Sequence, residues 1–226
     1  MSKNSFKVLR PGINTTFQDL GRDNLYHVGL PFSGAIDKRN FLIANSIITN
    51  KPDDAVLEFA YQGPLLEYSG VKTSFVITGN VNFKIIKKDA FEIKGECYKT
   101  YDLYNKDRLD IISTEKSVYG YLSVKGSFQI NKFCNSYSTT VRAEIGPNDG
   151  KKIEIDQIIT LNASDSTIKK SLEYFNSRIE FIRVIKGTNF DYFSEDSIKD
   201  FTSKEFIVSK LTDRMGMRLN GPKIKN

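Results

Sequence analysis

The residue types best suited to chemistry stand in two short segments near opposite ends of the sequence. Gln18, Asp19, Gly21 and Arg22 lie within one run of five residues, and segment 213–216 (Asp-Arg-Met-Gly) repeats the combination of acid, arginine and glycine. A carboxylate, an amide and a guanidinium at this spacing can bind a small polar amide or orient a carboxylate through charge-assisted hydrogen bonds. The same residues can equally hold a loop in place. The motif alone therefore leaves a binding role and a structural role open.

A second group of candidates surrounds the expected start of a helix. Apolar residues recur at helical spacing within 37–50, and Asp37 is a suitable N-cap for that helix. N–H groups at a helix start bind anions, so a substrate carboxylate or a carboxyphosphate-like group could sit there, with Ser33 facing it. The alternative is simple capping, in which Asp37 satisfies its own helix end, and both can hold together. Ser33 is not predicted to be a nucleophile, because no Gly-x-Ser-x-Gly turn surrounds it.

Two more ionisable residues lie within apolar strand patterns. Glu58 interrupts the run Val-Leu-Glu-Phe-Ala at 56–60. A carboxylate there is either paired or functional, since burial raises its pKa toward acid–base duty, or it is an ordinary Glu that faces outward. His27 is the single histidine of the chain and falls in a strand expected over 26–30. A lone strand histidine is more often a hydrogen-bonded structural residue than a catalyst.

Bulk composition narrows the class of protein. The formal net charge is +6, but Lys and Arg form no run longer than a pair, which indicates a solvated surface rather than nucleic-acid binding. Cys97 and Cys134 with a single His are too few ligands for zinc, so no metal is expected, whereas a disulfide between them stays open. The sequence shows no secretory signal and no stretch long enough to span a bilayer, so no membrane partner and a cytoplasmic location are expected.

Short apolar runs between turn residues predict a mainly-β fold. The expected strands are 6–9, 26–30, 56–60, 65–68, 74–78, 82–86, 109–113, 118–124, 127–130, 152–158, 179–185 and 206–209. Helices are expected over 37–50 and 194–201, the second with Ser194 as its cap. A polar stretch at 161–171 predicts a division into a β-barrel domain of residues 1–160 and the start of a second β sub-domain at 161–226.

Ordered motifs across the sequence resemble a known family. They read PG-x-x-TT-x-QDLGR from Pro11, G-x-P-x-SGA-x-D from Gly29, AN at 44–45, LE-x-x-x-x-GP from Leu57, YGYLSV at 119–124 and DRMG-x-R-L-x-GP from Asp213. In this order they are similar to the C subunit of bacterial 5-oxoprolinase, also called allophanate hydrolase subunit 2. That family is related to the carboxyltransferase part of urea carboxylase.

The resemblance implies a fold and a set of site residues. The fold is mainly β, with cyclophilin-like β-barrels, one or two short helices and a second barrel that is incomplete. The catalytic residues implied are Asp19, Arg22, Glu58, Asp213 and Arg214, and the substrate-binding residues are Thr16, Gln18, Ser33, Gly34, Asp37 and Asn45. In the relatives the late DRMG segment helps to line the pocket, so the two acid–arginine pairs are expected to converge at one polar site.

The resemblance also implies an activity that is shared with partner chains. The leading hypothesis is a subunit of ATP-dependent 5-oxoprolinase, which works with subunits resembling 5-oxoprolinase A and B to convert 5-oxoproline to glutamate. No G-x-x-x-x-G-K-[ST] or G-x-G-x-x-G motif marks a nucleotide site in this chain. One rival is carboxyl transfer to urea or a similar amide, which requires biotin on a partner. Another is a non-catalytic binding or regulatory module.

Two departures from the family pattern bear on these hypotheses. Residues 133–140 read Phe-Cys-Asn-Ser-Tyr-Ser-Thr-Thr where the family has a Gly-rich loop, and glycine is the residue that lets backbone approach a ligand. The family's Arg-Gln-Thr-Thr-Gly-Gly-Tyr-Pro motif does not occur. An incomplete barrel has an open edge that invites pairing. The alternatives are a separate chain that supplies the missing segment, a truncated form, or a barrel closed in another way.

Overall fold

The chain forms two compact units in the computed structural model, Met1–Tyr174 and Phe175–Asn226. The structure describes residues 4–163, 169–173, 181–214 and 216–225. The predicted division at residues 160 and 161 falls before the boundary between the units. Segment 169–172 belongs with the first unit because the N–H of Leu172 donates to the carbonyl of Tyr98 at 2.9 Å and that of Thr100 donates to the carbonyl of Lys170 at 3.0 Å.

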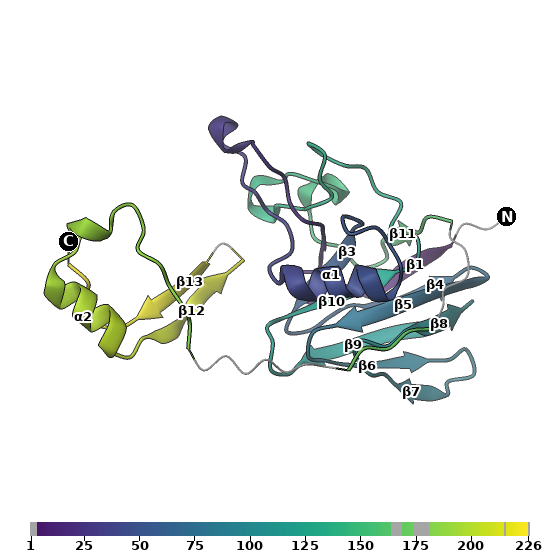
Figure 1. The fold of residues 1–226 in the computed structure, drawn as a ribbon. Coiled ribbons are helices and arrows are strands. Elements are labelled where there is room, and N and C mark those ends of the chain that lie inside the picture. Colours follow the sequence, from purple (N-terminus) through teal and green to yellow (C-terminus); the bar gives the residue numbers. More distant parts are fainter. Residues whose placement is uncertain (1–3, 164–168, 174–180, 215, 226) are drawn as a thin grey trace. The chain divides into compact units, whose positions relative to one another are not determined.

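Two antiparallel sheets make up the first unit (Figure 1). One has six strands in the order β11-β1-β4-β9-β6-β7, and the other has five in the order β2-β3-β10-β5-β8. The strands are β1 Ser5–Arg10, β2 Thr16–Gln18, β3 Val56–Ala60, β4 Leu65–Ser69, β5 Lys72–Thr78, β6 Val81–Ile86, β7 Glu92–Lys94, β8 Tyr101–Tyr104, β9 Arg108–Thr114, β10 Tyr119–Val124 and β11 Ile158–Thr160. Within the described residues, neither sheet closes on itself.

One apolar core fills the space between the two sheets. Alternation along β6 turns Phe83 and Ile85 inward, and alternation along β5 does the same for Phe75 and Ile77. These side chains belong to a single cluster that draws on both sheets, and Phe75 and Phe83 meet edge to face with ring centroids 6.1 Å apart. The mainly-β prediction is therefore confirmed, with the core placed between two facing sheets.

Helix α1, Lys38–Ile47, covers the outer face of the five-stranded sheet (Figure 1). Its Ala44 packs in a cluster with Val76 of β5, and its Phe41 packs with Tyr121 of β10. The central strands are consequently buried on both faces, and every residue of β3 is buried. This explains the near-continuous apolar run at 56–60, and it places Glu58 on the face of β3 that α1 and the loop before it cover.

Most predicted elements are confirmed, and the errors have local causes. Strands near 6–9, 56–60, 65–68, 74–78, 82–86, 109–113, 118–124 and 206–209 are present, as are both helices. Segment 26–30 is not a strand, because Tyr26–Val28 form a short 3-10 helix, η1, that ends on Gly29 with φ +76°. Segment 152–158 is not a strand either, because a turn at Asp156, with φ +63°, delays pairing to β11.

Two other predicted strands were also wrong within the described residues. Segment 127–130 contributes only an isolated bridge between Phe128 and Leu161. Residues 181–185 form no strand, and 179–180 lie outside the described residues. The connection between β10 and β11, which includes segment 127–130, contains two short 3-10 helices, η2 Val141–Ala143 and η3 Asn148–Gly150. These turns belong to the long connection that also supports the candidate site.

The second unit is small. It contains the short 3-10 helix η4 Phe190–Tyr192, helix α2 Glu195–Ser203, and a hairpin of β12 Ile207–Asp213 with β13 Gly216–Asn220. Ser194 caps α2 as predicted, since its side chain accepts a hydrogen bond from the N–H of Ser197 at 3.3 Å. Phe201 of α2 packs against Phe206, with ring centroids 5.8 Å apart.

Candidate functional site

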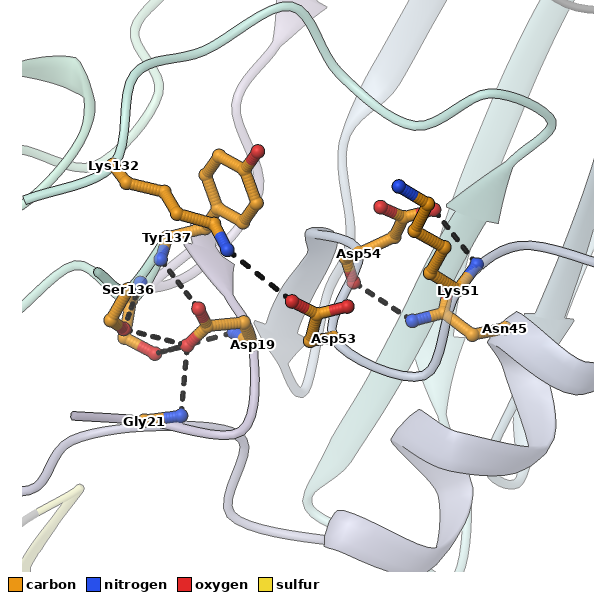
Figure 2. A network of polar contacts seen from close by, with 10 residues as sticks. Asp19, Gly21, Asn45, Lys51, Asp53, Asp54, Lys132, Ser136 and Tyr137 are labelled. Carbon is orange, nitrogen blue, oxygen red and sulfur yellow. Dashed lines mark hydrogen bonds and ion pairs between the residues drawn. The ribbon is translucent and has the colours of Figure 1, made fainter. Parts of the chain in front are cut away.

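Asp19 is the centre of a buried hydrogen-bond network that joins two distant segments (Figure 2). Its Oδ1 accepts from the N–H of Gly21 at 2.8 Å, from the Ser136 hydroxyl at 2.7 Å and from the Ser138 hydroxyl at 2.5 Å. Its Oδ2 accepts from the N–H of Tyr137 at 2.5 Å. Both carboxylate oxygens are therefore engaged by the protein, and the side chain holds segment 136–138 against the loop that follows β2.

Arg22 holds the same segment from a second position. Its guanidinium is buried, donates through Nη1 to the Thr140 hydroxyl at 3.0 Å and through Nη2 to the carbonyl of Ser138, and lies over the ring of Phe133. Burial lowers the pKa of Arg22, and the negative charge of Asp19 opposes that shift. The loop-fixing role that the sequence allowed for Asp19 and Arg22 is thus present in the structure. A role in catalysis stays a prediction.

Gln18 and Thr16 belong to the short edge strand β2 next to this network. The Gln18 amide nitrogen donates to the Thr16 hydroxyl at 2.8 Å and to the carbonyl of Thr139 at 2.9 Å. Its Oε1 is buried without a hydrogen-bond partner among the described residues, as is Nε of Arg22. Leaving a buried polar atom without a hydrogen bond is energetically costly. These two atoms, between β2 and segment 138–140, could therefore each form one further hydrogen bond.

The two N-terminal motif segments lie against each other. The N–H of Ala35 donates to the carbonyl of Asp19, and the N–H of Arg22 donates to the carbonyl of Phe32, both at 2.8 Å. Gly34 lies where these segments are closest: its φ is +86°, and a Cβ there would stand 2.8 Å from the carbonyl oxygen of Leu20. The motif needs glycine at this position because a side chain would force the segments apart.

Ser33 lies at the rim of this assembly. It is half-buried with φ +57°, and its hydroxyl donates to the carbonyl of Thr139 at 3.4 Å. A non-glycine residue in the left-handed region is strained unless its surroundings hold it there. Ser33 thus combines partial exposure with a fixed position, which suits contact with a ligand.

Glu58 of β3 fixes the end of the loop that leads from Ser33 into helix α1. Its Oε2 accepts the N–H of Ile36 at 2.8 Å, and it stands opposite Tyr121 on the neighbouring strand. The Tyr121 hydroxyl accepts the N–H of Asp37 at 2.7 Å. Burial and then the charge of Glu58 raise the pKa of Tyr121, so this phenol stays protonated. The paired alternative for Glu58 is the one observed.

Sequence reasoning did not identify Tyr121 as a site residue, although it noted the YGYLSV strand that contains it. The available signal was the register: β10 places Tyr121 directly opposite Glu58, and an acid in a buried strand needs a donor beside it. Ser136 and Ser138 were missed for a different reason. They lie more than a hundred residues from Asp19 in the sequence, and no local pattern connects them.

Asp37 caps α1, as predicted. Its Oδ1 accepts the N–H of Asn40 at 2.9 Å, and its Oδ2 accepts from the Asn40 side chain at 2.7 Å. Asn45 lies further along the helix, and its amide nitrogen donates to the carbonyl of Asp54 at 2.8 Å (Figure 2). Its amide oxygen accepts from the Ser123 hydroxyl at 2.7 Å. These contacts attach Asn45 to the sheet and to the loop before β3 and not to Asp19, so its substrate-binding role stays a prediction.

Segment 133–136 replaces the expected glycines with two other residues in left-handed conformations. Phe133 and Ser136 exchange backbone hydrogen bonds at 2.9 and 3.1 Å, and between them Cys134 and Asn135 have φ of 47° and 59°. This is the backbone of a tight two-residue hairpin turn, in which Asn is well tolerated. The missing glycines therefore do not prevent the turn. Cys134 is exposed, and both Cys97 and Cys134 are free thiols.

The remaining predicted residues belong to other elements of the chain. His27 is exposed in η1 and does not occupy a strand. Asp213 and Arg214 belong to the second unit, where the backbone of Asp213 pairs with Gly216 at the end of the β12–β13 hairpin. The side chain of Asp213 lies outside the described part of the structure. The convergence of this pair with Asp19 and Arg22 stays a prediction.

The described residues contain no group of three or more His, Cys, Asp or Glu side chains that could hold a metal ion. They also contain no helix that is long and apolar enough to cross a membrane.

The geometry brings the N-terminal motif segments together, and comparison with known proteins gives the family of the chain. The family model for the carboxyltransferase domain, subdomains A and B, matches residues 28–226. The chain belongs to this carboxyltransferase-domain family. The predicted resemblance is confirmed at this level.

Relatives within the carboxyltransferase-domain family fall into two groups. The chain is 27% identical over 209 residues to the 5-oxoprolinase C subunit of Haemophilus influenzae, covering 91% of this chain and 65% of that protein. It is also 27% identical over 237 residues to the urea amidolyase of Saccharomyces cerevisiae, covering 98% of this chain and 12% of that protein. The chain therefore spans about two thirds of the first relative and about an eighth of the second.

A solved structure of the same fold supports the architecture. The crystal structure of the K. lactis urea amidolyase matches all of this chain and 14% of its own, with a TM-score of 0.82 at 24% sequence identity. At that identity the likeness establishes the fold alone. It agrees with the carboxyltransferase-domain assignment and with a mainly-β, cyclophilin-like architecture.

Proposed function

We propose that this carboxyltransferase-domain chain is part of an ATP-dependent 5-oxoprolinase, active only together with partner subunits resembling 5-oxoprolinase A and B. The observation that carries the proposal is the extent of the match to the 5-oxoprolinase C subunit, which takes in 91% of this chain and 65% of the relative. The urea amidolyase match involves a small fraction of that protein, so less of its whole activity transfers. The reaction proposed is hydrolysis of 5-oxoproline to glutamate in the cytoplasm.

The site suits a small lactam that carries a carboxylate. Three buried side chains, Asp19, Arg22 and Glu58, hold the loops of the site in fixed positions. These loops are segments 19–22, 32–37 and 138–140. In this proposal those three residues position the loops, while Ser33 at the rim contacts the substrate. Arg22 supplies a buried positive charge that favours an anionic substrate in this proposal, and the charge of Asp19 offsets part of it. Opening the stable lactam requires ATP, which the partner subunits bind in this proposal.

A second candidate function is carboxyl transfer to urea or a similar amide. The observation that favours it is membership of the carboxyltransferase-domain family, together with the match to urea amidolyase along 98% of this chain. This activity needs a partner that carries biotin. The same fixed loops would then bind urea, a neutral amide, so the charge of Arg22 would contribute less to binding than it does with 5-oxoproline.

The two functions are separated by assaying one reconstituted complex with both substrates. The chain is co-expressed with the genomic neighbours that resemble the A and B subunits of 5-oxoprolinase. ATP hydrolysis is then measured with 5-oxoproline, with urea plus a biotinylated carrier, bicarbonate and the carboxylase that loads the carrier, and with neither. We expect hydrolysis that requires both 5-oxoproline and this chain. Stimulation by urea and the biotinylated carrier alone favours the second function. A folded complex that responds to neither would overturn both and leave a non-catalytic role.

A further inference from the structure

The outer face of the six-stranded sheet, which lies across the core from helix α1 (Figure 1), carries a small hollow. Glu67 of β4 stands opposite Arg108 of β9 in its lining. Their neighbours along the strands, Leu66 and Leu109, belong to the core, so alternation turns Glu67 and Arg108 outward. The hollow has a volume of about 200 Å³, below the range of about 300–1,000 Å³ that holds whole small molecules. It therefore suits a small ion or the charged group of a larger ligand.

Positive charge dominates the lining of this hollow. The cationic residues are Lys87 and Lys88 of the turn after β6, Lys106 of the turn before β9, and Arg108. Among the lining residues that the structure describes, Glu67 is the one acid. Its Oε1 contacts Nζ of Lys106 and its Oε2 contacts Nε of Arg108, each at 3.0 Å. Four cations against one carboxylate leave a formal surplus of three positive charges.

Asp107 holds the two turns beside the hollow together. Its side chain is 4% exposed, and its Oδ2 accepts from Nζ of Lys87 at 2.6 Å and from the N–H of Tyr104 at 3.0 Å. Its Oδ1 accepts the N–H of Lys88 at 3.3 Å. This buried carboxylate balances the charge of Lys87, so two positive charges remain in surplus on a backbone that is held in place.

Two cationic side chains keep hydrogen-bond donors for a ligand. Lys88 is half-buried, and among the described residues its ammonium contacts no carboxylate. Arg108 donates through Nε to Glu67, and within the same part of the chain its two Nη atoms have no acceptor. A hollow lined by charges of one sign concentrates ions of the opposite sign. A guanidinium fork and an ammonium on the wall of one hollow offer the several N–H donors that a phosphate group binds.

We propose that the hollow binds a phosphate group, either free phosphate or the phosphate of a small phosphorylated molecule, through Lys88 and the Nη atoms of Arg108. A phosphate group carries about 1.5 to 2 negative charges at pH 7, which matches the surplus, whereas a carboxylate carries one. Glu67 and Asp107 act as positioning residues, because they fix Arg108 and the turn that bears Lys88. The site is separate from the lactam site and does not depend on which substrate the assembly turns over.

Isothermal titration calorimetry of the full chain in low-salt buffer measures this binding, with sodium phosphate as the probe and sodium acetate as the singly charged comparison. We expect saturable binding of one phosphate per chain, and binding of acetate that is weaker by at least about tenfold, because acetate has less charge and fewer oxygens. Amide shifts in NMR spectra should locate the phosphate at residues 87–90 and 106–108. No saturable phosphate binding, equal affinity for acetate, or shifts confined to other residues would overturn the proposal.

A matched pair of substitutions in the β6–β7 hairpin tests the assignment to this hollow. Lys88→Gln removes a cation from the lining, and Lys94→Gln removes one from an exposed position of β7 outside it. We expect Lys88→Gln to weaken phosphate binding by about tenfold, since a charge-assisted hydrogen bond is lost, and Lys94→Gln to weaken it by less than about twofold. Equal weakening in both variants would show diffuse attraction to a charged surface and would contradict the proposal.

ADP as a further probe distinguishes the two sources of the phosphate group. Tighter binding of ADP than of inorganic phosphate, weakened by Lys88→Gln to the same extent, assigns the hollow to a phosphorylated ligand. Equal or weaker binding of ADP assigns it to free phosphate. An acidic peptide that binds at the hollow when neither phosphate compound does would overturn the proposal.

Discussion

Replacing Asp19 by Asn tests whether the buried carboxylate holds segment 136–138 in place. Asn keeps one oxygen acceptor but puts an amide nitrogen where Oδ2 now accepts the N–H of Tyr137 at 2.5 Å. Two donors then face each other, and a buried donor left without a partner costs about 1–3 kcal/mol. The three remaining hydrogen bonds to Oδ1 lose the contribution of the charge, so the total loss in unfolding free energy is about 3 kcal/mol.

Urea unfolding and amide hydrogen exchange measure this effect. With a denaturant slope of about 3 kcal/mol per molar, a loss of about 3 kcal/mol lowers the unfolding midpoint by about 1 M. Asp19→Asn should increase the exchange rate of the Tyr137 amide by a larger factor than the exchange rates of amides in β5 or β10. The matched control is Asp53→Asn, because Asp53 contacts Lys132 at 3.3 Å with both side chains substantially exposed (Figure 2), and such a pair contributes less than about 1 kcal/mol. Equal midpoint shifts in both variants would refute this reasoning.

Three other predictions concern Gly34 beside the site and two features of the sheets. Gly34→Ala should destabilise the chain by about 1–3 kcal/mol in urea unfolding, because of its positive φ and the close backbone beside it. Burial raises the pKa of the Cys97 thiol to about 11, whereas Cys134 is exposed. At pH 8 iodoacetamide should therefore modify Cys134 and spare Cys97, and equal rates at both thiols would contradict this. Hydrogen bonding to Lys106 lowers the pKa of Glu67 in the folded chain below the ordinary Glu value of 4.5. The Glu67 carboxylate therefore stabilises the fold above pH 4.5, and this stabilisation is lost as the pH falls through the lowered pKa of the folded state. Lys106→Met should flatten the pH dependence of unfolding below pH 5, and an unchanged slope would show that the pair contributes nothing.

The sequence predicts what is set by short-range patterns. The cap at Asp37, the strand at 56–60 and the helix that follows Ser194 depend on residues within a few positions of each other, and all three are present. The segment at 26–30 had strand composition, but Gly29 in the left-handed conformation ends a 3-10 turn there instead. Strand-like composition alone therefore did not decide the local structure of this segment.

The candidate site was predictable only on its N-terminal side. The motif segments at 18–22 and 32–35 do contact each other, in line with the resemblance that counted both among the site residues. Their partners at Ser136 and Ser138 could not be derived, because contacts across more than a hundred residues depend on how two sheets pack. The left-handed turn at Cys134–Asn135 shows the same limit, since no sequence pattern indicated it.

Whether the segments held by Asp19 form the substrate site is tested most directly by 5-oxoproline-dependent ATP hydrolysis in the complex assembled with Asp19→Asn. The assay is run at a temperature at which the Asp19→Asn and Asp53→Asn chains are both folded. We predict that Asp19→Asn raises the KM for 5-oxoproline at least about tenfold, equivalent to about 1.4 kcal/mol, while Asp53→Asn matches the unmodified chain. Equal kinetic constants in both variants would contradict this prediction and place the substrate elsewhere in the assembly.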